Sequence, residues 1–173
     1  LAIGAEPSLT SSPDEVASFV ESCGALVINL GMLDSSRRKA ITIAIDAARQ
    51  YRRPWVLDPA YAQISPIRLA FARSLLPNNP QIVRANQMEI GSLSGNAGAH
   101  ELARNVGGTV AATGETDLIT DGVHVLQISN GDPMMARVTA VGCVTSALTG
   151  SVLAGEDKHF LSAAIAIPMA VLE

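Results

Sequence analysis

Cys143 is one of two cysteines in the chain and lies in the segment VTAVGCVTSALTG, residues 138–150. The spacing of small residues after Gly142 predicts a helix, which places Cys143 in the first helical turn. At that position free backbone N–H groups and the helix dipole favour an anion. Two interpretations stay open: a small buried residue without a chemical role, and a residue beside an anion hole that faces a substrate hydroxyl.

A nucleophilic role for Cys143 is disfavoured by the residues around it. A phosphatase loop would carry a downstream arginine, and position 149 is a threonine. A cysteine hydrolase would need a histidine partner, and none of the three histidines of the chain has a placement that indicates one.

Arg84, Asn86 and Glu89 form a second polar group, in the segment RANQME, residues 84–89. Asn86 and Glu89 are three residues apart, a spacing typical of a capping box at the start of a helix. The same residues also suit a metal–phosphate group, in which Glu89 holds Mg²⁺ directly or through water and Arg84 contacts a nucleotide phosphate. The sequence leaves both interpretations open.

Asp58 closes the apolar run WVLDPA, residues 55–60, directly before Pro59. An Asp-Pro pair favours a turn, but a carboxylate at the end of a buried strand also needs a cation or a donor beside it. Mg²⁺ bound with phosphates typically takes one or two carboxylates, so Asp58 and Glu89 together form a candidate metal site. In ATGETD, residues 112–117, Thr113 and Gly114 either hold a phosphate or form an ordinary turn.

The segments that carry these residues alternate between strand-like and helix-like patterns. Unbroken apolar runs predict strands buried on both faces at residues 25–30, 55–60, 81–86 and 109–114. Helical patterns cover residues 12–23, 34–51 and 65–76. Asp121-Gly122 predicts a hairpin turn within residues 117–129. The alternation predicts an α/β fold with a mostly parallel central sheet, helices on both faces and an antiparallel hairpin near the edge.

In such a sheet, ligands bind beyond the carboxyl ends of the strands. The polar residues at those ends are therefore expected to lie close together although they are far apart in the sequence. Together with Gly31 and the loop that leads to Cys143, the candidates are Asn29, Asp58, residues 84–89 and residues 113–115.

Composition limits the classes of partner. The chain has 173 residues, of which 48% are apolar and only 3% aromatic, and its formal charge is −4. Nucleic-acid binding would need a basic stripe or exposed aromatic side chains, so we do not expect a nucleic-acid partner. The longest apolar run, residues 160–172, is too short for a membrane span. Two cysteines in apolar surroundings do not form a disulfide framework, which favours the cytoplasm.

The chain length favours one domain over residues 1–173. The chain begins at Leu1 without a methionine and stops inside an apolar helical pattern. We therefore expect this domain to be truncated at both ends.

Five segments together resemble the hydroxyethylthiazole kinase family of the ribokinase-like kinases in order and spacing. They are ALVINLGML, VLDP, VRANQMEI, ATGETDLITDG and VTAVGCVTSALTG, which cover essentially the whole chain. The most specific feature is Gly142-Cys143, where most ribokinase-like kinases carry Gly-Asp. The resemblance implies a ribokinase-like three-layer α/β/α fold and ATP-dependent phosphorylation of 4-methyl-5-(2-hydroxyethyl)thiazole, with Mg²⁺, in thiamine biosynthesis. It also implies a homotrimer with active sites at subunit interfaces.

The resemblance also implies a role for each candidate residue. Cys143 is the catalytic residue near the acceptor hydroxyl, Arg84 and Thr113 contact ATP, and Asp58 and Glu89 lie at the metal and the phosphates. The anion hole is formed by the loop residues Ala140, Val141 and Gly142, and Ala140 occupies a substrate-contacting position.

The loop departs from the family pattern at two positions. Ala140-Val141-Gly142-Cys143 stands where the family usually has Gly-Thr-Gly-Cys. If the first glycine has a positive φ angle, Ala140 weakens phosphate binding. The alternatives to a thiazole kinase are a related kinase for another small alcohol and a catalytically impaired binding protein of the same fold.

Overall fold

A six-stranded sheet forms the centre of the computed structural model, which describes residues 4–129, 131, 134, 140–156 and 158–170. The strands follow one another across the sheet in sequence order. The first four are parallel: β1 (Leu26–Asn29), β2 (Trp55–Asp58), β3 (Ile82–Asn86) and β4 (Thr109–Thr113). An antiparallel hairpin completes one edge with β5 (Asp117–Thr120) and β6 (Val125–Ile128).

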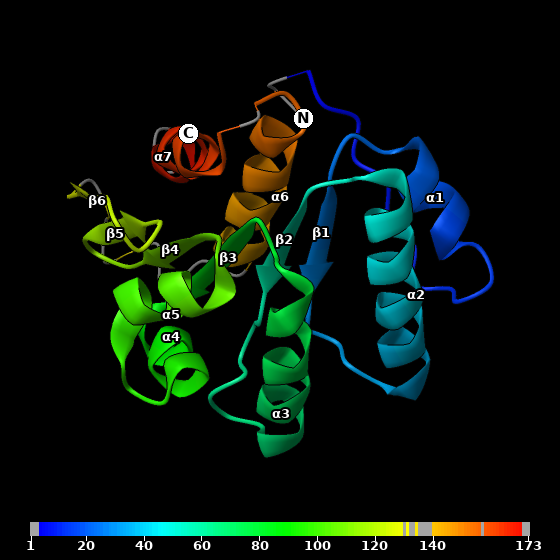
Figure 1. Ribbon diagram of the computed structural model, residues 1–173, viewed down its shortest axis with the longest axis horizontal. Helices are drawn as coiled ribbons and strands as arrows, with labels where there is room; N and C mark the ends of the chain where they lie inside the picture. The colour runs from blue at the N-terminus through cyan, green and yellow to red at the C-terminus, as the bar shows by residue number, and fades with distance from the viewer. Residues whose placement is uncertain (1–3, 130, 132–133, 135–139, 157, 171–173) are drawn as a thin grey trace.

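Helices cover both faces of the sheet, which gives three layers (Figure 1). On one face lie α2 (Ser35–Tyr51), α3 (Pro66–Leu75), α4 (Gln87–Ser94) and α5 (Gly98–Val106). The short 3₁₀ turn η1 (Leu76–Asn78) follows α3. On the other face lie α6 (Val141–Leu153) and α7 (His159–Met169). The first helix, α1 (Val16–Ser22), packs against α2 at the outer edge. The predicted α/β class, parallel sheet and edge hairpin are confirmed.

The strands have apolar side chains on both faces because both faces are covered. On β2, Val56 belongs to the cluster under α6 and α7, and Leu57 belongs to the cluster under α3, α4 and α5. Both side chains are fully buried. This is why the strands read as unbroken apolar runs in the sequence.

Three helices begin after a residue whose side chain caps them, and one helix begins later than predicted. Asp34, Ser65 and Asn86 each accept a backbone N–H of the helix that they precede. The predicted start of α1 at Ser12 is wrong, because the helix begins at Val16. The Ser12 hydroxyl accepts the N–H of Asp14, only two residues on, and such a bond forms a turn instead of a helix cap.

The parallel order brings the carboxyl ends of β1 to β4 to one edge of the sheet. Asn29 pairs in register with Asp58, and Asn86 pairs with Thr113. Helix α6 begins at the same edge, since side chains in its first two turns contact residues of β1 and β2 there. Part of the predicted loop before α6 and the end of the apolar run, residues 138–139 and 171–172, lie outside the described residues. No helix among the described residues is long and apolar enough to span a membrane.

Candidate active site

Asp58 connects three elements at this edge. Its carboxylate is almost completely buried, with 2% of the residue exposed. Oδ2 accepts the side-chain amide of Asn29 on β1 at 2.7 Å and the hydroxyl of Ser146 on α6 at 2.8 Å. Oδ1 accepts the N–H of Ala60 at 3.2 Å, which forms the turn predicted for an Asp-Pro pair. Asp58 therefore ties the ends of β1 and β2 to the start of α6.

Cys143 lies in the first turn of α6, as predicted. Its thiol is free and the residue is exposed, so the interpretation as a small buried residue is wrong. The sulfur accepts the Nδ2 amide of Asn29, with the two atoms 3.5 Å apart. The cysteine is thus held at the sheet edge and remains open to a ligand.

Arg84 and Thr113, the two predicted ATP contacts, meet each other. The Arg84 guanidinium donates through Nη2 to the Thr113 hydroxyl at 2.8 Å. Its Nη1 lies so close to the α-carbon of Gly142 that a β-carbon there would be 2.7 Å away. A guanidinium and the free N–H groups at a helix start both attract anions, and here they lie side by side.

Ala140 precedes α6 in the left-handed conformation, with φ 73°. A β-carbon is strained there, and glycine adopts this conformation without strain. Within the described residues no side chain caps the start of α6. The first position of the loop therefore has a backbone conformation that suits glycine, and Ala140 adopts this conformation with backbone strain.

Glu89 forms the capping box that the sequence allowed. Its Oε2 accepts the N–H of Asn86 at 2.8 Å, and the Asn86 amide oxygen accepts the N–H of Glu89 at 2.9 Å. Its second oxygen, Oε1, accepts the N–H of Tyr61 at 2.7 Å. The residue is buried, so Glu89 fixes both the start of α4 and the loop after β2.

Asp117 shapes the turn that follows Thr113. Its Oδ1 accepts the N–H of Gly114 at 2.9 Å, and the residue is buried. Burial raises the pKa of the Asp117 carboxyl, while the hydrogen bond from Gly114 and the charge of Arg84 act in the opposite direction. The carboxyl thus holds the turn that presents Thr113 to Arg84.

The sequence profile of the hydroxyethylthiazole kinase family matches residues 1–100 and 96–171 of the chain. The chain belongs to the hydroxyethylthiazole kinase family. The hydroxyethylthiazole kinase of Granulibacter bethesdensis is 42% identical over 180 residues, which cover 94% of this chain and 66% of that protein. The chain thus spans about two thirds of the length of this relative.

The fold of the chain is similar to solved structures, including one of a hydroxyethylthiazole kinase. The hydroxyethylthiazole kinase of Pyrococcus horikoshii superposes with a TM-score of 0.87 at 32% identity, over 94% of this chain and 68% of that one. A ribokinase-like superfamily protein of Enterococcus faecalis superposes with a TM-score of 0.67 at 16% identity, over 91% of this chain and 56% of that one. The second likeness shows the ribokinase-like fold alone.

Mg²⁺ is the metal that a hydroxyethylthiazole kinase is expected to use with ATP. Among the described residues, no group of three or more His, Cys, Asp or Glu side chains could hold a metal ion. Asp58 and Glu89 are nevertheless buried, and neither forms an ion pair with another described residue. They also accept consecutive N–H groups of one loop, those of Ala60 and Tyr61. The hydrogen bonds to both carboxylates come from neutral donors, so a Mg²⁺ ion that arrives with phosphates and keeps water ligands would fit beside them as the missing positive charge.

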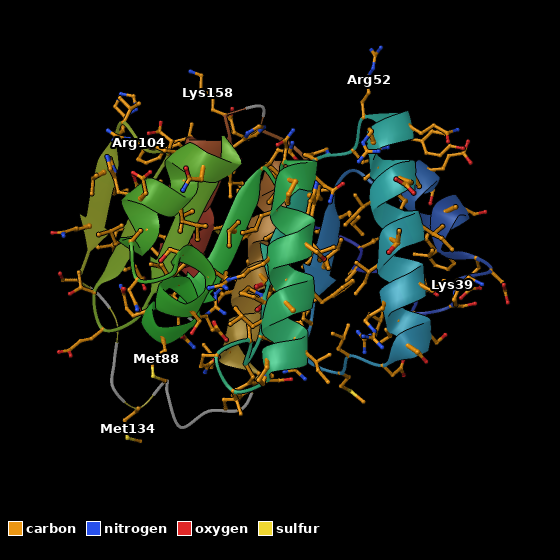
Figure 2. The ribbon with its side chains drawn as sticks, turned by 60° about the horizontal axis from the view of Figure 1, so that its bottom comes forward. Lys39, Arg52, Met88, Arg104, Met134 and Lys158 are labelled. Carbon is orange, nitrogen blue, oxygen red and sulfur yellow. The ribbon has the colours of Figure 1, made fainter. Side chains whose placement is uncertain are left out.

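Three basic side chains lie at the end of the molecule away from the candidate site. Arg52, Arg104 and Lys158 project at one end, and Met88 and Met134 project at the opposite end (Figure 2). Met88 belongs to the first turn of α4, directly after the carboxyl end of β3.

Sequence reasoning missed Arg68 and Ser146. Arg68 of α3 donates to the carbonyl oxygen of Ala60 at 2.6 Å and to that of Gly31 at 3.1 Å, so it joins the loops after β1 and β2. In the sequence it resembles an ordinary surface charge on an amphipathic helix. Ser146 resembles a small core residue of α6, and only its bond to Asp58 reveals its place in the site.

Proposed function

We propose that the chain forms the catalytic core of a hydroxyethylthiazole kinase. It transfers the γ-phosphoryl group of ATP to the primary hydroxyl of 4-methyl-5-(2-hydroxyethyl)thiazole, which yields ADP, the phosphate ester and a proton, within thiamine biosynthesis. The observation that carries this proposal is the position of Cys143. It is exposed in the first turn of α6, at the same helix start that holds the Arg84–Thr113 pair.

Arg84 and Thr113 bind ATP phosphate oxygens in this proposal. The guanidinium is held by the Thr113 hydroxyl and lies against Gly142, so it enters the site already oriented. The N–H groups of Ala140, Val141 and Gly142 form the anion hole and stabilise negative charge on the transferred group, as the free N–H groups at a helix start do. Phosphoryl transfer depends mainly on such positioning and charge stabilisation.

Cys143 acts on the acceptor alcohol. Its sulfur accepts the attacking hydroxyl as a hydrogen-bond donor, which orients the oxygen toward phosphorus and makes Cys143 a weak general base. Asp58 and Glu89 are the residues that would hold Mg²⁺, which would neutralise part of the negative charge of the ATP phosphates. Ala140 lies beside the substrate at the entrance of the loop.

We further propose a homotrimer whose active sites lie at subunit interfaces, in the cytoplasm. Exposed apolar side chains around the site edge support an interface: Met32, Tyr61, Ile64 and Ile67. A reducing compartment keeps the Cys143 thiol free for its role. The molar mass measured by light scattering during gel filtration tests the trimer, and a monomer at all concentrations contradicts it.

Calorimetry and turnover together test the function. Titration of the chain with Mg²⁺–ATP is expected to show micromolar binding, and a panel of small alcohols is expected to give ATP consumption with the thiazole alcohol alone. Turnover with a different alcohol favours the related kinase. The strained Ala140 is the observation that favours an impaired binding protein, and binding without turnover on any alcohol would select that alternative.

A further inference from the structure

We propose that Asn29 is a positioning residue that holds the Cys143 sulfur for its role toward the acceptor hydroxyl. The inference rests on the proposed function in one respect, the role of Cys143. The hydrogen bonds that carry it stand independently of the reaction.

The orientation of the Asn29 amide is fixed from one side. Its Oδ1 accepts the N–H of Gly31 at 2.8 Å. A β-carbon at Gly31 would lie 2.8 Å from the same oxygen, so a side chain there would push the Asn29 amide out of this position. Because a backbone N–H can only donate, the oxygen of the amide must face Gly31, and the NH₂ group must face the site.

Both N–H bonds of that NH₂ group are used at the site. Nδ2 donates to Asp58 Oδ2 at 2.7 Å and lies 3.5 Å from the Cys143 sulfur, which accepts. An amide NH₂ carries two protons, and these two bonds account for both of them. The N–H donated by Asn29 therefore fixes the position of the Cys143 sulfur at the sheet edge and leaves the sulfur able to accept the hydroxyl of the acceptor.

Asn29 and Ser146 both donate to Asp58, but only Asn29 of these two also donates to the Cys143 sulfur. Ser146 donates to the same Asp58 oxygen, at 2.8 Å, and lies three residues after Cys143 in α6. Ser146 and Asn29 therefore both satisfy the buried carboxylate, but the bond to the sulfur is made by Asn29. This makes Ser146→Ala a matched control for Asn29→Ala.

Alkylation of Cys143 by iodoacetamide at a fixed pH tests the proposal in a Cys23→Ala background, in which Cys143 is the sole thiol. In Asn29→Ala the second-order rate constant is expected to fall about tenfold, equivalent to ~1.4 kcal/mol, because the hydrogen bond that holds the sulfur is lost. In Ser146→Ala it is expected to change less than about twofold, because only the bond to Asp58 is lost. Equal effects of the two substitutions, or no effect of Asn29→Ala, would overturn the positioning role.

Steady-state kinetics separate this inference from the proposed function. Asn29→Ala is expected to lower kcat for the thiazole alcohol about tenfold or more, with an unchanged KM for ATP. A wild-type chain without turnover contradicts the proposed function, while the alkylation rates still decide the role of Asn29. If thermal melting shows that Asn29→Ala does not fold, Asn29→Ser replaces it, because a serine hydroxyl retains a donor but is too short to bridge Asp58 and Cys143; the same two outcomes apply.

Discussion

Substitution of Ala140 by glycine is expected to stabilise the chain. Ala140 precedes α6 with φ 73° and ψ 1°, in the left-handed region. Removing the β-carbon relieves a clash that destabilises the folded chain by roughly 1–2 kcal/mol. Glycine also gives the unfolded chain more conformational freedom, which offsets ~0.4–1 kcal/mol of this gain. The net gain is about 0.5–1 kcal/mol, which raises the Tm of a chain of this size by about 1–4 °C.

Calorimetric melting of Ala140→Gly and of Ala147→Gly measures this effect against a matched control. Ala147 lies inside α6, where glycine lowers stability by roughly 0.5–1 kcal/mol. Each substitution removes one methyl group, at the N-cap residue of α6 for Ala140 and inside α6 for Ala147. The Tm is nevertheless expected to rise for Ala140→Gly and to fall for Ala147→Gly. A fall in Tm for Ala140→Gly, similar to that for Ala147→Gly, would refute the left-handed conformation and the strain argument. If the chain is active, Ala140→Gly is also expected to lower KM for ATP.

Three further predictions follow from the site and the hairpin. Gly142→Ala places a β-carbon against the Arg84 guanidinium, so KM for ATP is expected to rise about tenfold with little change in Tm. An unchanged KM for ATP would contradict a role of Arg84 in ATP binding. The hydrogen bond with His124 is the main cause that lowers the pKa of Asp121 to about 2. The stability that this pair contributes is therefore present above pH 3.8, the ordinary pKa of the carboxyl, and is lost as the pH falls through about 2. NMR titration of Asp121 in His124→Ala is expected to show a midpoint nearer 3.8. Burial raises the pKa of Asp117, so its contribution to stability is complete below 3.8 and is lost as pH rises through the raised value. The Tm of Asp117→Asn minus the Tm of wild type is therefore expected to increase as the pH rises from acidic to neutral. A Tm difference that stays constant across this pH range would contradict the effect of burial on Asp117.

Local signals were sufficient for most of the fold. The apolar runs before Asn29, Asp58 and Thr113 end where the strands end, within one or two residues. The Asn86–Glu89 spacing predicted a capping box, which α4 has. These features depend on neighbours in the sequence, so the sequence reveals them. The start of α1 failed because Ser12 had a second local partner, the N–H of Asp14, which competed with the helix cap.

The assembly of the site depends on contacts between distant segments. Asn29 meets Cys143 across 114 positions of sequence, and Ser146 meets Asp58 across 88. No local pattern distinguishes Asn29 from any polar residue at a strand end, or Arg68 from any charged residue on a helix surface. The general rule for parallel sheets predicted that these ends converge, but which atoms bond to each other follows from the packing of α3 and α6 against the sheet.

In the proposed reaction, Cys143 at this sheet edge serves phosphoryl transfer from ATP to the thiazole alcohol. The most direct test of this role is quantification of the thiazole phosphate ester and ADP by mass spectrometry, with the wild-type chain and with Cys143→Ser in the presence of Mg²⁺–ATP. We expect one ester per ADP for the wild type, and for Cys143→Ser a kcat at least about tenfold lower with an unchanged KM for ATP. Absence of the ester with folded wild-type chain, or full kcat in Cys143→Ser, would contradict this role.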